Sequence, residues 1–84
     1  MALRLRYQTA AQFAARLRER YRTASREEAA RIATWLLDRI DAGDLTDVQV
    51  RSAFELTTQQ YTALKTRMTA LRDAYRAVQA AAGE

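Results

Sequence analysis

The chain of 84 residues contains no cysteine, no histidine and no proline, and it has only two glycines. Without cysteine there is no disulfide framework, no thiolate metal ligand and no cysteine nucleophile. Without histidine the commonest proton carrier of active sites is missing, and no glycine-rich phosphate loop occurs. We therefore expect a protein that is not an enzyme and that holds no cofactor, metal or small-molecule substrate.

Long apolar runs are also lacking. The longest uninterrupted runs are three residues, as at residues 35–37 and 80–82. A membrane-spanning helix needs about 20 apolar residues, and a signal-peptide core needs at least seven or so. Together with the lack of cysteine, this predicts a soluble cytoplasmic protein that does not enter a membrane.

Charge is plentiful but unevenly distributed. The chain has 14 Lys and Arg against 10 Asp and Glu, a net charge of +4. Residues 1–26 carry seven arginines and a single acid, Glu19, whereas residues 27–84 carry seven basic residues and nine acids. Such asymmetry favours an anionic partner for the front end, or docking of the two halves against each other. Arginines scattered for solubility are an equally good interpretation.

Four segments open with a capping box, a Ser or Thr followed three residues later by Gln or Glu. The pairs are Thr9 with Gln12, Ser25 with Glu28, Thr46 with Gln49, and Thr57 with Gln60. They predict helices over residues 9–22, 25–41, 47–56 and 58–81, with Gly43 ending the second in a left-handed conformation. The short turn after the first helix predicts an antiparallel hairpin.

The two ends of the chain have different patterns. Residues 1–7 alternate between apolar and basic side chains, which is a strand period, and we interpret residues 1–8 as an arm. The alanine-rich residues 79–84 are expected to fray. The whole chain is then one all-α domain, a small four-helix bundle of a helix hairpin, a short third helix and a long fourth helix.

The fourth helix carries the clearest pattern in the sequence. Apolar residues recur at spacings of three and four over its whole length: Tyr61, Leu64, Met68, Leu71, Tyr75 and Val78. We call these six residues the apolar seam. A stripe of this kind usually faces the core. Because the helix is longer than the first two, its last turns are expected to project and to offer apolar surface to a partner.

Acidic residues cluster at the end of the second helix and just after it: Asp38, Asp41, Asp44 and Asp47. The cluster lacks the spacing of an EF-hand and its bidentate Glu. We interpret these residues as helix-end and surface charge, and predict no metal site.

Two functions remain open. The first is an interaction module that binds a protein partner or a second copy through its last helix, with contacts from Trp35, Tyr61, Arg67, Arg72 and Tyr75. In a parallel homodimer, Arg67 would lie against Arg72 of the second copy, and the two would repel each other. The pattern therefore favours an acidic or antiparallel neighbour.

The alternative is a DNA-binding helix-turn-helix protein built from the third and fourth helices. Gln59, Gln60 and Thr62 would read base edges, while Lys65 and Arg67 would contact phosphates. Thr57 stands where the turn of such a motif usually has glycine.

Residues 44–68 and the closing LRDAYRAVQ of residues 71–79 resemble small uncharacterised proteins of proteobacterial phages and prophages. The resemblance includes no functional motif. It implies an accessory or assembly role in a mobile element and identifies no site residue.

Overall fold

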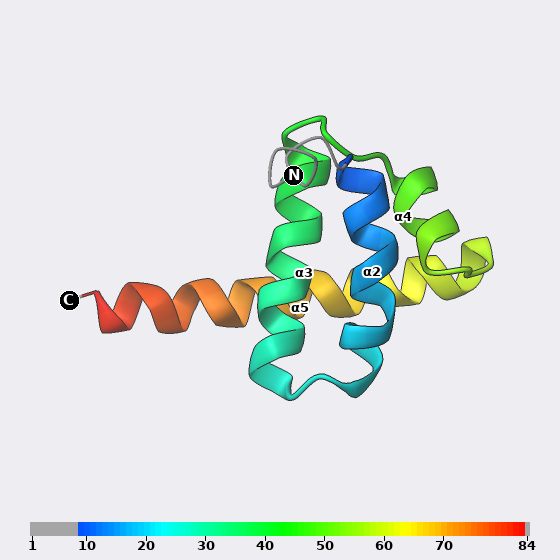
Figure 1. Cartoon of the computed structure of the whole chain (residues 1–84). Helices are drawn as coiled ribbons and strands as arrows, with labels where there is room; N and C mark the ends of the chain where they lie inside the picture. Colours follow the sequence, from blue (N-terminus) through cyan, green and yellow to red (C-terminus); the bar gives the residue numbers. More distant parts are fainter. Residues whose placement is uncertain (1–8, 84) are drawn as a thin grey trace, which may run out of the picture.

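The computed structural model describes residues 9–83, so the predicted arm lies outside the described residues. Within this range there are four α-helices and no strand (Figure 1). The helices are α2 (Ala10–Thr23), α3 (Arg26–Asp41), α4 (Asp47–Ala53) and α5 (Thr58–Ala82). The prediction of a small all-α, bundle-like globule is confirmed.

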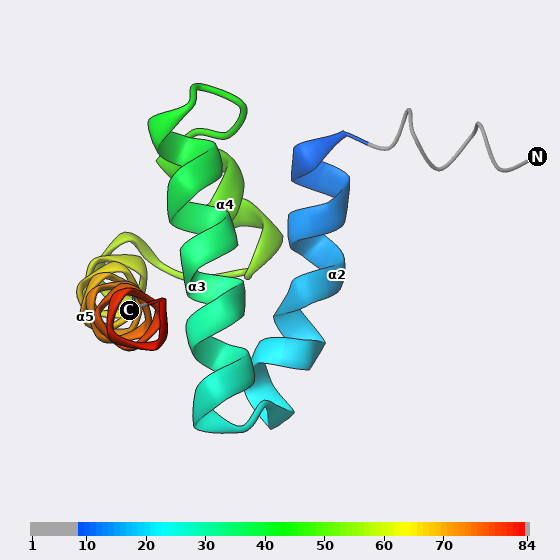
Figure 2. The same cartoon turned by 90° about the vertical axis from the view of Figure 1, so that its left-hand side faces the viewer.

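Helices α2 and α3 lie side by side as the predicted antiparallel hairpin, and α5 crosses them at a steep angle (Figures 1 and 2). Helix α3 is packed between α2 on one side and α5 on the other, while α4 packs against α2. Helix α5 has 25 residues and is about 37 Å long. It therefore spans nearly the longest dimension of the molecule, 39 Å.

Three of the four predicted capping boxes are complete, those that begin at Thr9, Thr46 and Thr57. At the start of α3 only half of the box forms. The Ser25 hydroxyl accepts the Glu28 amide at 3.1 Å, but the Glu28 carboxylate turns away to the Arg20 guanidinium at 2.8 Å. A charged pair outcompetes the return bond to a neutral amide, so Glu28 ties α3 to α2 instead.

Helix α4 is three residues shorter than predicted, and the reason lies in its last turn. The Glu55 and Leu56 amides bond back to the Ser52 and Arg51 carbonyls, which is a Schellman motif. Glu55 adopts φ 56°, a left-handed conformation that glycine usually supplies. The position that a turn glycine would occupy is therefore Glu55, and the sequence-based choice of Thr57 was wrong.

The same motif ends α3, here with the expected residue. Gly43 has φ 84°, its amide bonds to the Ile40 carbonyl, and the Asp44 amide bonds to the Arg39 carbonyl. An added Cβ at Gly43 would meet nothing within 4 Å, so the backbone angle alone favours glycine there. The prediction for Gly43 is confirmed.

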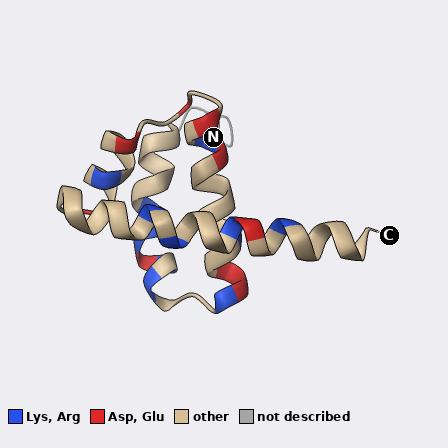
Figure 3. Ribbon diagram, turned by 180° about the vertical axis from the view of Figure 1, so that it is seen from behind, with Lys and Arg blue, Asp and Glu red and all other residues tan. Residues whose placement is uncertain are grey.

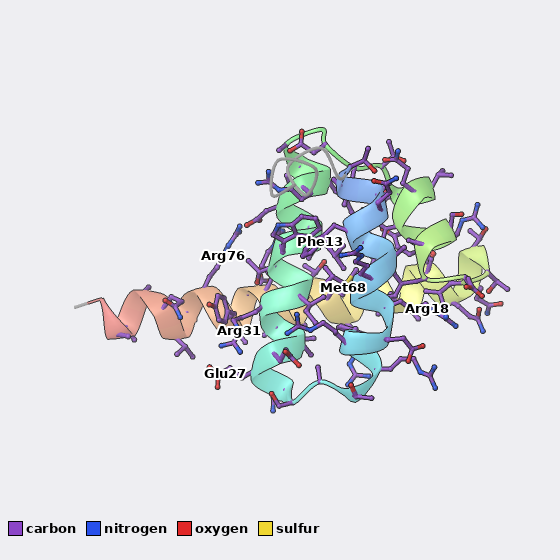
Figure 4. The ribbon with its side chains drawn as sticks, in the orientation of Figure 1. Phe13, Arg18, Glu27, Arg31, Met68 and Arg76 are labelled. Carbon is purple, nitrogen blue, oxygen red and sulfur yellow. The ribbon has the colours of Figure 1, made fainter. Side chains whose placement is uncertain are left out.

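The core forms where the helices cross. Ala14 of α2 and Ala33 of α3 are completely buried. Leu36 of α3, Val50 of α4 and Met68 of α5 are also fully buried. Figure 4 shows Met68 where α5 passes behind the hairpin. One cluster thus joins all four helices.

Burial of the apolar seam changes along α5. Tyr61 and Met68 are buried, whereas Leu71 and Tyr75 are half-buried and Val78 is 65% exposed. The first half of the seam is a wall of the core, as predicted, and the second half runs out on the part of α5 that projects from the body (Figure 1). The helix continues to Ala82, so fraying of residues 79–84 stays a prediction.

Candidate interaction surface

Tyr61, one of the predicted contact residues, belongs to the interior. Its ring is buried, and its hydroxyl donates to the Asp47 carboxylate at 2.6 Å. Burial, reinforced by this carboxylate, raises the pKa of the Tyr61 phenol. The Lys65 ammonium, 2.8 Å from Asp47, and the Tyr61 hydroxyl together lower the pKa of the Asp47 carboxyl. These three side chains join the first turns of α4 and α5 and leave Tyr61 unavailable to a partner.

Arg72, a second predicted contact, is also used within the chain. Its side chain is 15% exposed and donates to Asp41 at 2.9 Å and to Asp38 at 3.3 Å. Asp41 contributes most to the raised pKa of the Arg72 guanidinium. Arg76 adds a bond of 2.6 Å to Asp38, and Figure 4 shows it reaching from the projecting half of α5 toward α3. The two arginines fasten α5 across α3.

All four members of the acidic cluster are paired with cations. Asp38 and Asp41 hold the arginines of α5, Asp44 accepts from Arg39 at 2.9 Å, and Asp47 binds Lys65. Within residues 9–83, no group of three or more acids is placed to hold a metal ion. The acidic cluster therefore supplies ion pairs that connect α3, α4 and α5.

Trp35 lies on a different face from the projecting end of α5. Its indole packs edge-on against Phe13 of α2, with ring centroids 4.9 Å apart at 70°. Arg16 and Arg39 border the same shallow hollow. This aromatic pair holds α2 against α3, and it does not join the other predicted contacts.

Two of the residues predicted to contact DNA, Thr62 and Lys65, line one hollow, but the five residues do not share one side of α5. The Gln60 side chain accepts the Thr57 amide at 2.9 Å and is occupied as a cap, and Lys65 is paired with Asp47. Gln59 and Thr62 are exposed. Arg67 follows Lys65 by two residues, which is about 200° around a helix, so the two side chains leave α5 on opposite sides.

Two predicted contacts, Tyr75 and Arg67, do lie on one continuous surface. Its outer part, the α3–α5 groove, runs between the first turns of α3 and the projecting half of α5. The groove is lined by Arg26, Glu27, Ala30, Leu71, Ala74, Tyr75, Val78 and Gln79. The α5 side of this lining is mainly apolar. Figure 4 places Glu27, with Arg31, beside the projecting helix; the two side chains pair with each other at 3.1 Å.

The inner part of the surface, the arginine cleft, lies between the α2–α3 turn and the middle of α5. Its lining is Tyr21, Arg22, Ala24, Arg26, Ala29, Arg67, Ala70 and Leu71. Arg26 and Leu71 line both parts, so the groove and the cleft are continuous. Figure 3 shows basic segments at both ends of the α2–α3 turn and on α5.

The arginine cleft has an excess of positive charge. None of its lining residues is acidic, and its three arginines come from three helices. Arg22 pairs with Glu19 at 3.1 Å, whereas neither Arg26 nor Arg67 pairs with a carboxylate among residues 9–83. The cleft is therefore suited to an anionic group.

The Tyr21 hydroxyl is a polar group enclosed at this cleft. It is shielded from solvent and has no hydrogen-bond partner among residues 9–83, while its ring packs edge-on against Phe54 at 6.1 Å. Burial raises the pKa of the Tyr21 phenol, and the positive charge of Arg67 opposes that rise. An enclosed hydroxyl without a partner is costly, so Tyr21 lowers the stability of the fold at this point.

Sequence reasoning did not foresee that Tyr21, Arg22 and Arg26 lie beside α5. The signal available was the excess of arginine in residues 1–26. That excess could not show that two of these arginines meet Arg67, because the meeting depends on the crossing of α5 over the hairpin.

No protein-family model matches this chain, and neither a curated protein nor a solved structure matches it. Among the described residues, no helix is both long and apolar enough to cross a membrane. The class of protein defined by the fold is a small all-α globule with one projecting helix.

Proposed function

We propose that this chain is a non-enzymatic interaction module that binds a protein partner through the projecting half of α5. The observation that carries the proposal is the change in burial along the apolar seam, from fully buried Met68 to 65% exposed Val78. A chain that needed α5 only to close its own core has no use for the later seam residues. Their regular spacing is typical of a helix that packs on both of its halves.

The projecting half of α5 keeps apolar surface that a partner can bury. Burying a large apolar side chain contributes about 1.5–3 kcal/mol, and Tyr75, Val78 and Leu71 all keep part of their surface exposed. The groove beside them is bounded by α3, which gives a partner two walls to pack against. A helix laid into such a groove is a common way for proteins to recognise each other.

The fixed position of α5 supports the same function. Arg72 and Arg76 hold the helix on α3 at the base of its projecting half. The exposed seam is thus presented from a rigid base, which lowers the entropy lost on binding. The resemblance to phage and prophage proteins would make the partner a component of a mobile element, with an accessory or assembly role for this chain.

The test compares Val78→Asp with Ala80→Asp, used as baits for proteins of the cell that encodes the chain. The two positions are exposed and lie about 200° apart around α5, so the same charge is placed on opposite sides. Val78→Asp should lose a partner that both the parent chain and Ala80→Asp retain. Retention of that partner by both variants, or its loss from both, would contradict a contact on the seam side.

The DNA-binding alternative has weaker support, since Lys65 and Gln60 are engaged within the chain. It predicts that a DNA duplex is retarded by the chain and that the affinity falls steeply with salt. A Lys65→Glu, Arg67→Glu double variant that still binds the duplex would exclude the proposed reading surface.

A further inference from the structure

We infer that the partner segment is an acidic amphipathic helix, which lies in the α3–α5 groove and places carboxylates in the arginine cleft. The inference rests on the proposed function and adds the chemistry of the partner to it. It draws on the continuity of two unlike surfaces, one apolar and one basic, that share Arg26 and Leu71.

The apolar part of the surface selects a protein segment over a nucleic acid. Ala30, Leu71, Ala74, Tyr75 and Val78 line the outer groove and supply mostly carbon to its walls. A phosphate backbone has nothing apolar to place there, because its outer surface is charged and hydrated. An amphipathic helix has an apolar stripe of the width that such a groove accepts.

The basic part of the surface determines the charge of that helix. Arg26 and Arg67 face the arginine cleft without a carboxylate partner among the described residues, and Arg22 adds a third guanidinium. Arginine binds carboxylates through two parallel hydrogen bonds, which is stronger than a single neutral bond.

The same charges disfavour a second copy of this chain as the occupant. Two copies that met through this surface would bring two sets of three arginines together, and each copy already has a net charge of +4. Most acids of the described residues are already paired with arginine or lysine of their own chain. The cleft is therefore complementary to a foreign acidic segment.

The test screens a random library of helical peptides for binding to the folded full-length chain. Peptides that also bind the Val78→Asp variant are removed by counter-selection. The expected peptides depend on Val78 and are enriched in Glu and Asp at one end of the apolar stripe. Replacing Arg67 by Glu should weaken a selected peptide about tenfold or more, whereas Ala80→Asp should bind it normally. Changing to Lys the one peptide acid whose loss has no further effect in the Arg67→Glu chain should restore binding to that chain.

The outcomes separate this inference from the proposed function. Peptides that depend on Val78 without enrichment in acids would overturn the acidic partner and leave the interaction module standing. A library in which no peptide depends on Val78 would overturn both. If a DNA duplex binds more tightly than any peptide, and Arg67→Glu abolishes that binding, the partner is a nucleic acid and not a peptide. If the chain sediments as a dimer, and Val78→Asp abolishes the dimer, the partner is a second copy of this chain.

Discussion

Replacing Glu55 by Gly should stabilise this protein, although it removes an ion pair. Glu55 is held at φ 56° in the Schellman motif that ends α4. A left-handed conformation costs a residue with a side chain roughly 1–2 kcal/mol, a cost that glycine avoids. Part of this gain in stability is offset, because glycine loses more backbone conformational entropy on folding than Glu does.

The ion pair that is lost contributes little. The Glu55 carboxylate is 3.5 Å from Arg18, and its side chain is 70% exposed. Pairs of this kind contribute about 0–1 kcal/mol, and salt screens them. The net effect of Glu55→Gly is then a gain of about 0.5–1 kcal/mol, which raises the melting temperature of a domain of this size by about 2–8 °C.

The assay is thermal and urea unfolding followed by circular dichroism, with two matched variants. Glu55→Ala removes the same ion pair but keeps the left-handed strain, so it should be no more stable than the parent. Gly43→Ala is the reverse change in the other Schellman motif, where a Cβ meets nothing within 4 Å, and it should cost about 1 kcal/mol. A Glu55→Gly protein no more stable than Glu55→Ala would refute the account of the α4 end.

Three further predictions concern the contacts that hold α5 in place. Met68→Ala should cost about 2–5 kcal/mol in urea unfolding, because a fully buried side chain leaves a cavity where the helices cross. Arg72→Met should cost about 1–2 kcal/mol at low salt and less at high salt, as expected for the loss of charged bonds to partly exposed carboxylates. The lowered pKa of the Asp47 carboxyl stabilises the fold above its ordinary pKa of about 3.9, and this contribution is lost as the pH falls from about 4. Between pH 7 and pH 3 the parent should therefore lose more stability than Asp47→Asn, by up to about 1 kcal/mol, and equal losses would contradict the pairing with Lys65.

The helices could be predicted because their signals are local. Ser or Thr at the start and the three-four spacing of apolar residues locate α2, α3 and α5 to within a residue at each end. The buried half of the apolar seam and the exposure of Val78 follow from the length of α5 relative to the hairpin. These features depend on hydrogen bonds and burial along one helix, which the sequence displays directly.

The remaining features depend on residues far apart in the chain. Nothing near Glu55 in the sequence signals a left-handed residue, because glycine is the usual sign of one. The pairing of Arg72 with Asp41, 31 residues away, depends on how α5 crosses α3. The same crossing brings Arg67 to Arg26 in the arginine cleft and turns Tyr61 inward, and no local pattern in the sequence shows either contact.

The last two turns of α5 have a consequence for any binding partner. Every residue from 77 to 83 is exposed, so these turns stay wound through the high helix propensity of alanine and not through packing. The affinity of a complex at this end must then include the free energy of helix formation in these two turns. Exchanging one alanine there for glycine would cost about 1 kcal/mol of that free energy. Evolution could thus weaken or strengthen the complex by changing residues that touch neither the partner nor the folded body.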